Sequence, residues 1–563
     1  MEMFKIITTL FGGLAIFIYG MNLMSDGLQK AAGDKMRNIL SMLTANPIFG
    51  VLAGALTTAV LQSSSATTVM VIGFVSAGLM KLPQAISVIL GANIGTTITA
   101  QLIAFKVGDF AWVFVIIGFI LFFFLKNKKE ILSDVGQIFF GFGILFVGIN
   151  VMADTMVPLA DSPIFIDMML KVQNIPVLGI LVGTIMTVII QSSSATVAVL
   201  QNLASTAGPD GISSVIGLTG ALPILFGNNI GTTITALLAS IGASVNAKRT
   251  AIAHTIFNVG GTVIFVWFIP QIATFIHSLS PQGTEVEVIS REIANAHMFF
   301  NVACTIIFLP LIGLLVKICT KLIPGEDKEK LNSEPVYLDE KVIHQPVFAI
   351  HLAIQELTRN ARFAFDMLVK SKQAFLSNDK EAMDSVMETE TTLNHIRAKI
   401  VNYLSLILSS ESITEAQTEK VSALMHVAGD IEHIGDYCTN IIALAREKEE
   451  NKYEFSDMAY EEIYECFNQG QSIMEVTIEA LEKGDVNMAF EVIKLEDENN
   501  KTEIQLRNKH MQRLNDKTCS PAFTVIYTDI IHNIERIADS CKNIAEAVLK
   551  GAKQKGIIDN LDL

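Results

Sequence analysis

The stretch Gln62-Ser63-Ser64-Ser65-Ala66-Thr67 occurs a second time, letter for letter, as Gln191-Ser192-Ser193-Ser194-Ala195-Thr196. Both copies interrupt long apolar runs. Polar groups at membrane depth are costly unless they are satisfied by protein or bind a ligand. The two copies therefore mark the places where this chain departs from ordinary transmembrane helices.

The duplication extends beyond these six residues. The sequence GANIGTTITA at residues 91–100 follows the first copy, and GNNIGTTITA at residues 227–236 follows the second. Upstream, Gly20-x-Asn22-x-Met24-x-Asp26 is matched by Gly148-x-Asn150-x-Met152-x-Asp154. Three matched blocks in one order indicate an internal duplication with a period of about 130 residues, which is typical of the duplicated halves of transporters.

Charge is distributed very unevenly along the chain. Hydrophobic residues make up 51% of it and the mean hydropathy is +0.46. Residues 1–325 hold 15 basic and 13 acidic side chains, whereas residues 326–563 hold 26 and 43. We therefore expect an apolar membrane unit followed by an acidic soluble unit. That acidity argues against nucleic acid as a partner, because phosphate backbones are bound by Lys and Arg surfaces.

Basic residues predict the orientation of the helices, because Lys and Arg concentrate in short cytoplasmic loops. The first apolar helix, residues 6–28, is followed by a basic cluster, whereas the matching helix of the second half, residues 135–156, is preceded by one. The two clusters are Lys30, Lys35 and Arg37, and Lys126, Lys128 and Lys129. The matching helices then run in opposite directions, so the two repeats are predicted to be inverted in the membrane.

The remaining segments are also predicted to be helical, so the fold class is all-α. We predict a polytopic membrane transporter with two inverted repeats, each of which contains a re-entrant hairpin. The hairpins are expected over residues 47–80 and 176–207, each broken by its polar block. Further crossings are expected at residues 82–105, 111–125, 212–241, 251–272 and 294–318. In domain terms we predict a transmembrane domain over 1–325 (repeat 1 at about 6–126, repeat 2 at about 134–272, an extra helix at about 294–318), a linker over 326–345, a helical domain over 346–553 and a tail over 554–563.

The polar blocks have chemistry that suits an anion and a hard cation. Serine and threonine hydroxyls donate to an anion, while Gln and Asn carbonyls and free backbone carbonyls suit sodium. Neither block contains Lys or Arg, so a bound oxyanion would depend on helix N-termini and a co-bound cation. The alternative is structural, since membrane Ser and Thr also bond back to the preceding turn and Gly-x-x-x-Gly spacing serves helix packing.

The paired Gln-Ser-Ser-Ser blocks, each followed by a Gly-x-Asn-Ile-Gly-Thr block, resemble the type II sodium/phosphate cotransporter family over most of residues 1–320. Two copies of a His-x-x-Phe-Asn element, beginning at His254 and His297, look like that family's element of the same pattern. We interpret both histidines as buried helix contacts with hydrogen bonds. In this reading the phosphate contacts are Ser63, Ser64, Ser65, Thr67, Ser192, Ser193, Ser194 and Thr196, and the sodium contacts are Gln62, Gln191, Asn93, Thr96, Asn229 and Thr232.

The soluble part is also duplicated. Glu432-x-x-x-Asp436-x-x-x-Asn440 recurs as Glu535-x-x-x-Asp539-x-x-x-Asn543. Spacing of four places both carboxylates on one helix face, where they repel unless a cation compensates. This pattern resembles PhoU-type domains, tandem three-helix bundles that regulate phosphate uptake and whose acidic motifs bind metal. The resemblance implies a divalent or iron-type metal at Glu432, Asp436, Glu535 and Asp539; the alternative is a solvated acidic face.

The sequence thus predicts a sodium-coupled inorganic phosphate symporter in the lipid bilayer of the plasma membrane, with a cytoplasmic PhoU-like regulatory domain. Two alternatives stay open: an exporter that relieves excess phosphate, and a phosphate sensor or signalling scaffold. A cytoplasmic regulatory partner and oligomerisation also stay open. An enzyme is not expected, because neither a Gly-x-Ser-x-Gly elbow nor a phosphate-binding P-loop occurs in the sequence.

Overall fold

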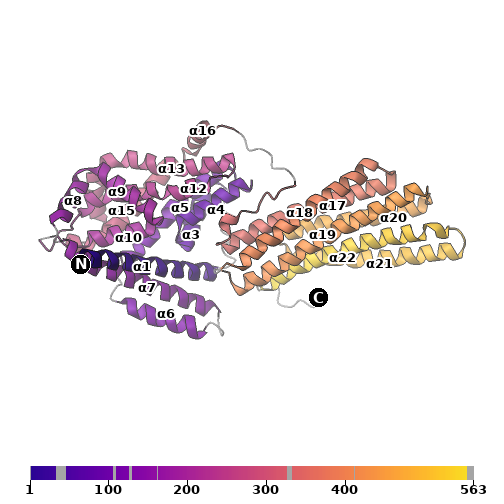
Figure 1. Cartoon of the computed structure of the whole chain (residues 1–563), viewed down its shortest axis with the longest axis horizontal. Helices are drawn as coiled ribbons and strands as arrows, with labels where there is room; N and C mark the ends of the chain where they lie inside the picture. Colours follow the sequence, from indigo (N-terminus) through magenta and orange to yellow (C-terminus); the bar gives the residue numbers. More distant parts are fainter. Residues whose placement is uncertain are drawn as a thin grey trace. The chain divides into compact units, whose positions relative to one another are not determined.

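The chain divides near residue 327 into two compact units in the computed structural model (Figure 1). Each unit is described by itself. The structure describes residues 2–32, 46–105, 110–125, 130–160, 163–208, 210–325, 333–410 and 413–554. Of the sequence predictions, the basic residues Lys35, Arg37, Lys126, Lys128 and Lys129, part of the linker and nearly all of the predicted tail lie outside these ranges.

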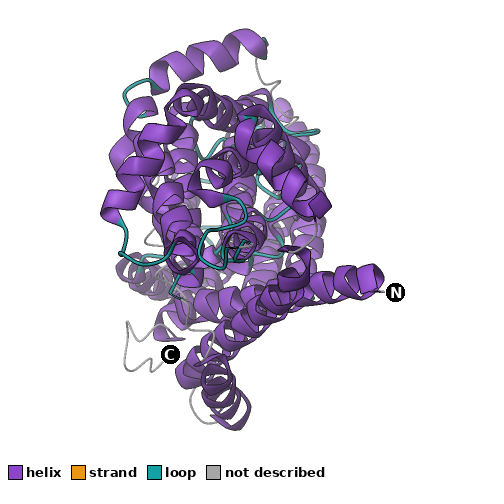
Figure 2. Ribbon diagram, turned by 90° about the vertical axis from the view of Figure 1, so that its left-hand side faces the viewer, coloured by secondary structure: helices purple, strands orange, loops and turns teal. Residues whose placement is uncertain are grey.

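Helices account for most of the described residues of the first unit (Figure 2). They are α1 (Glu2–Ala32), α3 (Pro47–Leu61), α4 (Ser64–Ser76), α5 (Leu82–Ile103), α6 (Ala111–Leu125), α7 (Glu130–Ala160), α8 (Pro163–Asn174), α9 (Pro176–Ile190), α10 (Ser193–Ala204), α11 (Gly217–Gly231), α12 (Thr233–Ala239), α13 (Val245–Phe265), the 3-10 turn η2 (Val266–Phe268), α14 (Ile269–Leu279), α15 (Glu285–Phe308) and α16 (Ile312–Leu322). By length and composition, five helical spans of the described chain could cross a membrane, or six if the bent pair α15–α16 counts as one. The all-helical membrane prediction is confirmed.

The helices α1 and α7 are equivalent in the two repeats and pack against each other through glycine. Gly20 corresponds to Gly148 in the duplicated motif, so Gly13 corresponds to Gly141. A Cβ added to Gly13 would lie 3.1 Å from the Gly148 carbonyl oxygen, and one on Gly148 would lie 2.7 Å from that of Gly13. Gly20 and Gly141 face each other in the same way, at 2.8 Å and 2.7 Å. Gly13 contacts Gly148, and their counterparts in the other repeat, Gly141 and Gly20, contact each other. The contact is therefore two-fold symmetric. The two helices run antiparallel, as inverted repeats require.

A second pair of equivalent helices is formed by α13 and α15. The elements starting at His254 and His297 align Phe257 with Phe300 and Phe265 with Phe308. In the structure Phe257 packs edge-to-face on Phe308, with 5.3 Å between the ring centroids, and Phe265 packs on Phe300 with 5.5 Å between them. Phe257 contacts Phe308, and their counterparts Phe300 and Phe265 contact each other. This arrangement indicates a two-fold symmetric contact. The helix predicted as extra is therefore the partner of α13.

The prediction of one continuous helix over residues 294–318 is wrong. The chain bends by 83° between α15, which ends at Phe308, and α16, which begins at Ile312. Pro310 lies at this bend and explains it, since proline lacks the N–H that would continue the helix and its ring clashes with the carbonyl four residues earlier.

The second unit is a duplicated helical bundle. Its helices are α17 (Pro346–Ser377), α18 (Lys380–Leu408), α19 (Glu415–Glu450), α20 (Asp457–Lys483), α21 (Val486–Asn515) and α22 (Thr524–Gln554), with the 3-10 turns η3 (Glu340–Val342) and η4 (Pro521–Phe523). The first three long helices pack on one another, as do the last three, and the two groups meet along α17–α20 and α19–α22 (Figure 1). Apolar side chains spaced three and four residues apart bury one face of each helix.

Candidate functional site

Each polar block breaks a helix in the same way. Gln62 ends α3 with φ 52° and ψ 21°, and Gln191 ends α9 with φ 56° and ψ 22°. This left-handed conformation is uncommon for a residue with a side chain. The next residue then caps a new helix: Ser63 Oγ accepts from Ala66 N at 3.1 Å, and Ser192 Oγ accepts from Ala195 N at 3.2 Å. Both polar blocks are thus the tips of helical hairpins, as predicted.

Threonine hydroxyls connect the two arms of each hairpin. Thr58 Oγ1 donates to Thr67 Oγ1 at 2.9 Å, and the matching pair Thr187 and Thr196 lies at 3.3 Å. Thr67 and Thr196 also donate to the carbonyl oxygens of Ser63 and Ser192, at 3.2 Å and 3.0 Å. Both threonines are completely buried. These two predicted phosphate contacts thus brace the hairpin, which places them behind the tip.

The serines divide into two roles. Ser63 and Ser192 are helix caps, whereas Ser64 and Ser193 are the first helical residues of α4 and α10. The opening turn of a helix has N–H groups without intrahelical partners and carries a partial positive charge. Each hairpin tip therefore presents backbone donors and hydroxyls together, an arrangement that suits an oxyanion without any Lys or Arg.

Glycine brings the following helix against each hairpin. A Cβ on Gly54 would lie 2.1 Å from the Val88 carbonyl oxygen, and one on Gly183 would lie 2.0 Å from that of Ile224. Such distances are far below van der Waals contact, so α5 and α11 can approach α3 and α9 only because these positions lack side chains. This packing places the predicted sodium contacts on α5 and α11 beside their own hairpin.

Those predicted sodium contacts have different environments in the two repeats. Gln62 is buried; its Nε2 donates to the Ala59 carbonyl oxygen at 2.5 Å and its Oε1 accepts from Thr99 at 2.7 Å. Its counterpart Gln191 is exposed. The Asn93 amide donates to the Ile89 carbonyl oxygen at 2.9 Å, and Thr232 Oγ1 donates to that of Asn228 at 2.9 Å. Thr96 is buried on α5.

Asn229 belongs to a buried polar cluster that sequence reasoning assigned only in part. His297 Nε2 donates to Asn229 Oδ1 at 3.3 Å, and Asn229 Nδ2 donates to Asn301 Oδ1 at 3.4 Å. The interpretation of His297 as a buried, hydrogen-bonded contact is confirmed. That interpretation is wrong for His254, which is equally buried but has no hydrogen-bond partner for either ring nitrogen among the described residues.

The two halves of the membrane unit meet at specific polar contacts. Ser65 of the first hairpin lies 3.0 Å from Thr235 of α12, measured between hydroxyl oxygens. On α10 of the second hairpin, Gln201 Nε2 donates to the carbonyl oxygens of Ala100 at 3.1 Å and of Ser290 at 2.9 Å. Thr99 and Thr235 were not among the predicted residues, although the repeated GTTIT sequence contains both.

In the soluble unit the two acidic motifs also face each other symmetrically. Asn440 donates to Asn533 Oδ1 at 3.3 Å, and its counterpart Asn543 donates to Asp430 Oδ1 at 3.1 Å. Since Asp430 corresponds to Asn533, α19 and α22 are related by a two-fold contact.

Basic side chains lie next to the carboxylates predicted to bind metal. Arg397 lies 3.3 Å from Glu432, and Arg536 lies 2.8 Å from Asp539. Burial and the neighbouring Asp539 raise the pKa of Glu535 to about 7, and Asp436 is exposed. Within the described ranges no three His, Cys, Asp or Glu side chains are grouped so that they could hold a metal ion. As these side chains lie, they do not fit a metal.

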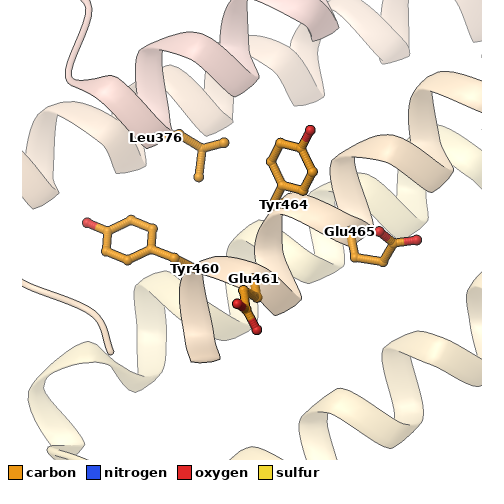
Figure 3. Close-up of a pocket in the computed structure, with 5 residues that line it drawn as sticks. All are labelled: Leu376, Tyr460, Glu461, Tyr464 and Glu465. Carbon is orange, nitrogen blue, oxygen red and sulfur yellow. The ribbon is translucent and has the colours of Figure 1, made fainter. Parts of the chain in front are cut away.

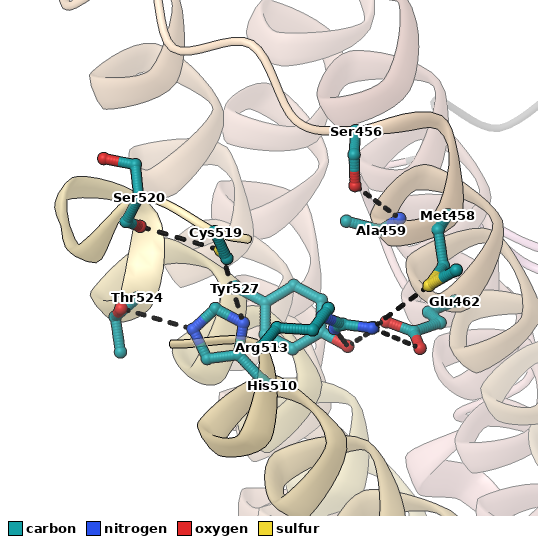
Figure 4. A network of polar contacts seen from close by, with 10 residues as sticks. All are labelled: Ser456, Met458, Ala459, Glu462, His510, Arg513, Cys519, Ser520, Thr524 and Tyr527. Carbon is teal, nitrogen blue, oxygen red and sulfur yellow. Dashed lines mark hydrogen bonds and ion pairs between the residues drawn. The ribbon is translucent and has the colours of Figure 1, made fainter. Parts of the chain in front are cut away.

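Two other features of the soluble unit lie apart from these motifs. A surface pocket of about 500 Å³ is lined by Leu376 of α17 and by Tyr460, Glu461, Tyr464 and Glu465 of α20 (Figure 3). At one end of the bundle, Arg513 forms a two-pronged ion pair with Glu462 at 2.8 Å and 2.9 Å, and Tyr527 donates to the same carboxylate at 2.5 Å (Figure 4). We assign this network to stability of the bundle, since it ties α20, α21 and α22 together.

An apolar helical unit with two antiparallel repeats, each interrupted by a polar hairpin tip, has the architecture of a membrane transporter. Comparison with known proteins agrees. The Na+/Pi-cotransporter family matches residues 16–154 and 160–280, and the PhoU domain matches residues 357–445 and 463–548. The chain belongs to the Na+/Pi-cotransporter family and carries a C-terminal PhoU domain, which confirms the resemblance seen in the sequence.

Individual relatives cover different parts of the chain. "Uncharacterized protein YqeW" of Bacillus subtilis is 35% identical over 313 residues, 56% of this chain and 97% of that protein. "Putative inorganic phosphate export protein YjbB" of Salmonella typhimurium is 21% identical over 548 residues, 97% of this chain and 98% of that protein. "Sodium-dependent phosphate transport protein 2A" of Rattus norvegicus is 35% identical over 101 residues, 17% of this chain and 16% of that protein. The crystal structure of PhoU from Pseudomonas aeruginosa matches 37% of this chain and all of that one, with 18% identity and a TM-score of 0.35.

Proposed function

We propose that this chain is a sodium-coupled symporter of inorganic phosphate that works by alternating access. The observation that carries the proposal is the paired helix break, which supplies backbone N–H groups and serine hydroxyls for an oxyanion on each hairpin. Side-chain carbonyl groups of Gln and Asn lie on the hairpin and on the helix packed against it, where they can serve a sodium ion. A co-bound cation compensates the charge of phosphate in a site that contains neither Lys nor Arg.

The PhoU domain is assigned to the cytoplasm as a regulatory domain. Arg249, at the start of α13, donates to the carbonyl oxygens of Ile323 at 3.0 Å and Gly325 at 2.7 Å. The end of the membrane unit is thereby attached to the first turns of α13, which contain Lys248 and Arg249. Basic residues favour the cytoplasmic side, so this contact supports a cytoplasmic start for the segment that leads to the PhoU domain.

Export is the second candidate, favoured by the relative named as a phosphate export protein, which matches nearly the whole chain. The direct test is uptake of radiolabelled phosphate into sealed proteoliposomes with an inward sodium gradient, compared with an equal potassium gradient. Sodium-dependent accumulation is expected for the symporter. Phosphate flux that does not depend on the sodium gradient would favour the exporter. Phosphate binding without flux would favour a sensor. The matched control is the double variant Ser64→Ala/Ser193→Ala, which should insert normally and transport poorly.

A further inference from the structure

The last threonine of the shared GTTIT sequence contacts the same hairpin in both repeats. Thr99 and Thr235 occupy the same position in the two repeats, yet their contacts differ. Thr99 Oγ1 donates to Gln62 Oε1 in its own repeat, at 2.7 Å. Thr235 Oγ1 lies 3.0 Å from Ser65 Oγ in the opposite repeat. Both hydroxyls therefore hold the tip of the first hairpin.

The tip of the second hairpin lacks both of these contacts. Symmetry would pair Thr235 with Gln191 and Thr99 with Ser194. Instead Gln191 is exposed, and in the described part of the chain neither Gln191 nor Ser194 has a hydrogen bond from its side chain. The repeats are equivalent in sequence, but their tips are in different states.

An independent asymmetry lies deeper in the unit. Asn229 of α11 is bonded to His297 and Asn301 of α15. The equivalent cluster is Asn93 of α5 with His254 and Asn258 of α13, and α13 packs against α5. There, His254 Nδ1 and Nε2 and Asn258 Oδ1 are buried without a hydrogen-bond partner in the described chain. Buried polar atoms of this kind are disfavoured, and they would be satisfied if α5 and α13 adopted the contacts that α11 and α15 make in this state.

We propose that Thr99 and Thr235 form a clasp that alternates between the two hairpin tips. In the state described here the clasp holds Gln62 and Ser65. In the opposite state Thr235 donates to Gln191 and Thr99 pairs with Ser194, while Asn93 bonds to His254 and Asn258. This inference rests on the proposed transport function, for which it supplies the positioning residues that close one hairpin as the other opens.

The exchange follows from symmetry and from the count of hydrogen bonds. Two-fold contacts between α1 and α7 and between α13 and α15 allow the repeats to swap conformations without changing the interface between them. Each bond lost at the first hairpin is replaced by its counterpart at the second. The same number of polar groups is satisfied in both states, so neither state is favoured strongly.

Disulfide trapping tests the clasp in the full-length chain. The background is Cys304→Ala/Cys319→Ala, which removes the two native thiols of the membrane unit. The pair Ser65→Cys/Thr235→Cys reports the contact seen here, and the pair Ser194→Cys/Thr99→Cys reports the exchanged contact. We expect mild oxidation to link both pairs, with the linked peptides identified by mass spectrometry. A protein carrying all four substitutions should form one disulfide or the other in each molecule, never both.

A second cysteine pair tests the exchanged state independently, in case the Ser194→Cys/Thr99→Cys variant fails to fold. Gln191→Cys/Thr235→Cys, bridged by a short bis-methanethiosulfonate reagent, reports the other exchanged contact. Linking of Ser65→Cys/Thr235→Cys together with failure of both exchanged pairs would overturn the clasp. Linking is read without phosphate flux, and transport is measured in the Cys304→Ala/Cys319→Ala background, which keeps Ser65 and Ser194. The outcomes therefore separate: exchange without transport in that background would overturn the proposed function alone, and transport without exchange would overturn the clasp alone.

Discussion

The hydroxyl of Ser25 donates a 2.7 Å hydrogen bond to the carbonyl oxygen of Leu61, the last residue of α3. A helix that ends inside a membrane unit leaves its final carbonyls without intrahelical partners, and lipid cannot satisfy them. The α1 helix therefore supplies the donor that makes the break at Gln62 tolerable. This bond links the symmetric α1–α7 pair directly to the first hairpin.

Removal of that donor should destabilise the membrane unit. Ser25→Ala leaves a buried carbonyl unsatisfied, which costs about 1–3 kcal/mol. The midpoint of thermal unfolding in detergent should fall accordingly. Thr8→Ala is the control on the same helix, because Thr8 is exposed and its hydroxyl donates to the carbonyl oxygens of Phe4 and Lys5 in its own preceding turn. Equal effects of the two substitutions would contradict the role given to Ser25.

The serines of one tip should separate into stability and binding. Ser63→Ala removes the cap of α4 and should cost about 1 kcal/mol, while Ser63→Asn, which also caps, should restore most of it. Ser64→Ala leaves the cap intact, so under the proposed function it should raise the KM for phosphate with little change in unfolding. The two readouts are thermal unfolding and initial uptake rate. Loss of stability in Ser64→Ala with an unchanged KM would count against the assignment.

The glycines between hairpin and neighbouring helix should tolerate no side chain. Gly54→Ala and Gly183→Ala place a methyl group about 2 Å from a backbone carbonyl oxygen, so the helices must move apart at a cost of about 1–3 kcal/mol or more. The yield of monodisperse protein in gel filtration should fall sharply. Gly12→Ala on α1, with nothing within 4 Å of the added Cβ, should behave like the wild type. A normal yield for both hairpin variants would show that this packing is less tight than described.

The Glu462–Arg513 pair should give the PhoU domain an acid-sensitive stability. Burial raises the pKa of Glu462, but the hydrogen bonds from Arg513 and Tyr527 outweigh it, so the pKa lies below its ordinary value of 4.5. A lowered carboxyl pKa stabilises the fold above the unfolded pKa, and the gain is lost as pH falls through the folded one. The contribution of the Glu462 carboxyl to stability should thus be flat from pH 7 to about pH 5 and decline below about 4.5.

The matched variant is Glu462→Gln, which removes the titrating group and leaves Arg513 without its ion-pair partner. It should lower stability at pH 7 by on the order of 2–4 kcal/mol and flatten the decline at low pH. Urea unfolding followed by circular dichroism at several pH values measures both effects. A decline in the variant as steep as in the wild type would assign the acid sensitivity to other carboxylates.

Sequence reasoning located the hairpins because their breaks are local. A polar block inside an apolar run, with serine directly after the turn residue, specifies both the helix end and the new cap. The inverted relation of the repeats was likewise predictable from the duplicated motif and the basic loops. Pro310 was a visible signal for the bend before α16, yet the apolar pattern that continues past it concealed the break.

The contacts that distinguish the two repeats could not be read from the sequence. Thr99 and Thr235 lie in the same stretch, NIGTTITA, in both repeats, so the hydrogen bond of one to Gln62 and of the other to Ser65 depends on the tertiary arrangement. The pairing of α13 with α15 was hidden for a different reason. Their elements are only 43 positions apart, whereas the other blocks repeat at about 130. Of the two basic partners named for the acidic motifs, Arg397 comes from another helix, α18, whereas Arg536 lies inside the second motif and is visible in the sequence.

The edge-to-face ring pairs Phe257–Phe308 and Phe265–Phe300 have a thermodynamic consequence for the whole machine. Both pairs join the same two helices, at 5.3 Å and 5.5 Å between ring centroids. Under the proposed function this interface would be kept in both end states, so it would add the same free energy to each and would not favour either. The direction of net flux would then be set by the sodium and phosphate gradients, because a passive carrier can only bring its coupled substrates to equilibrium.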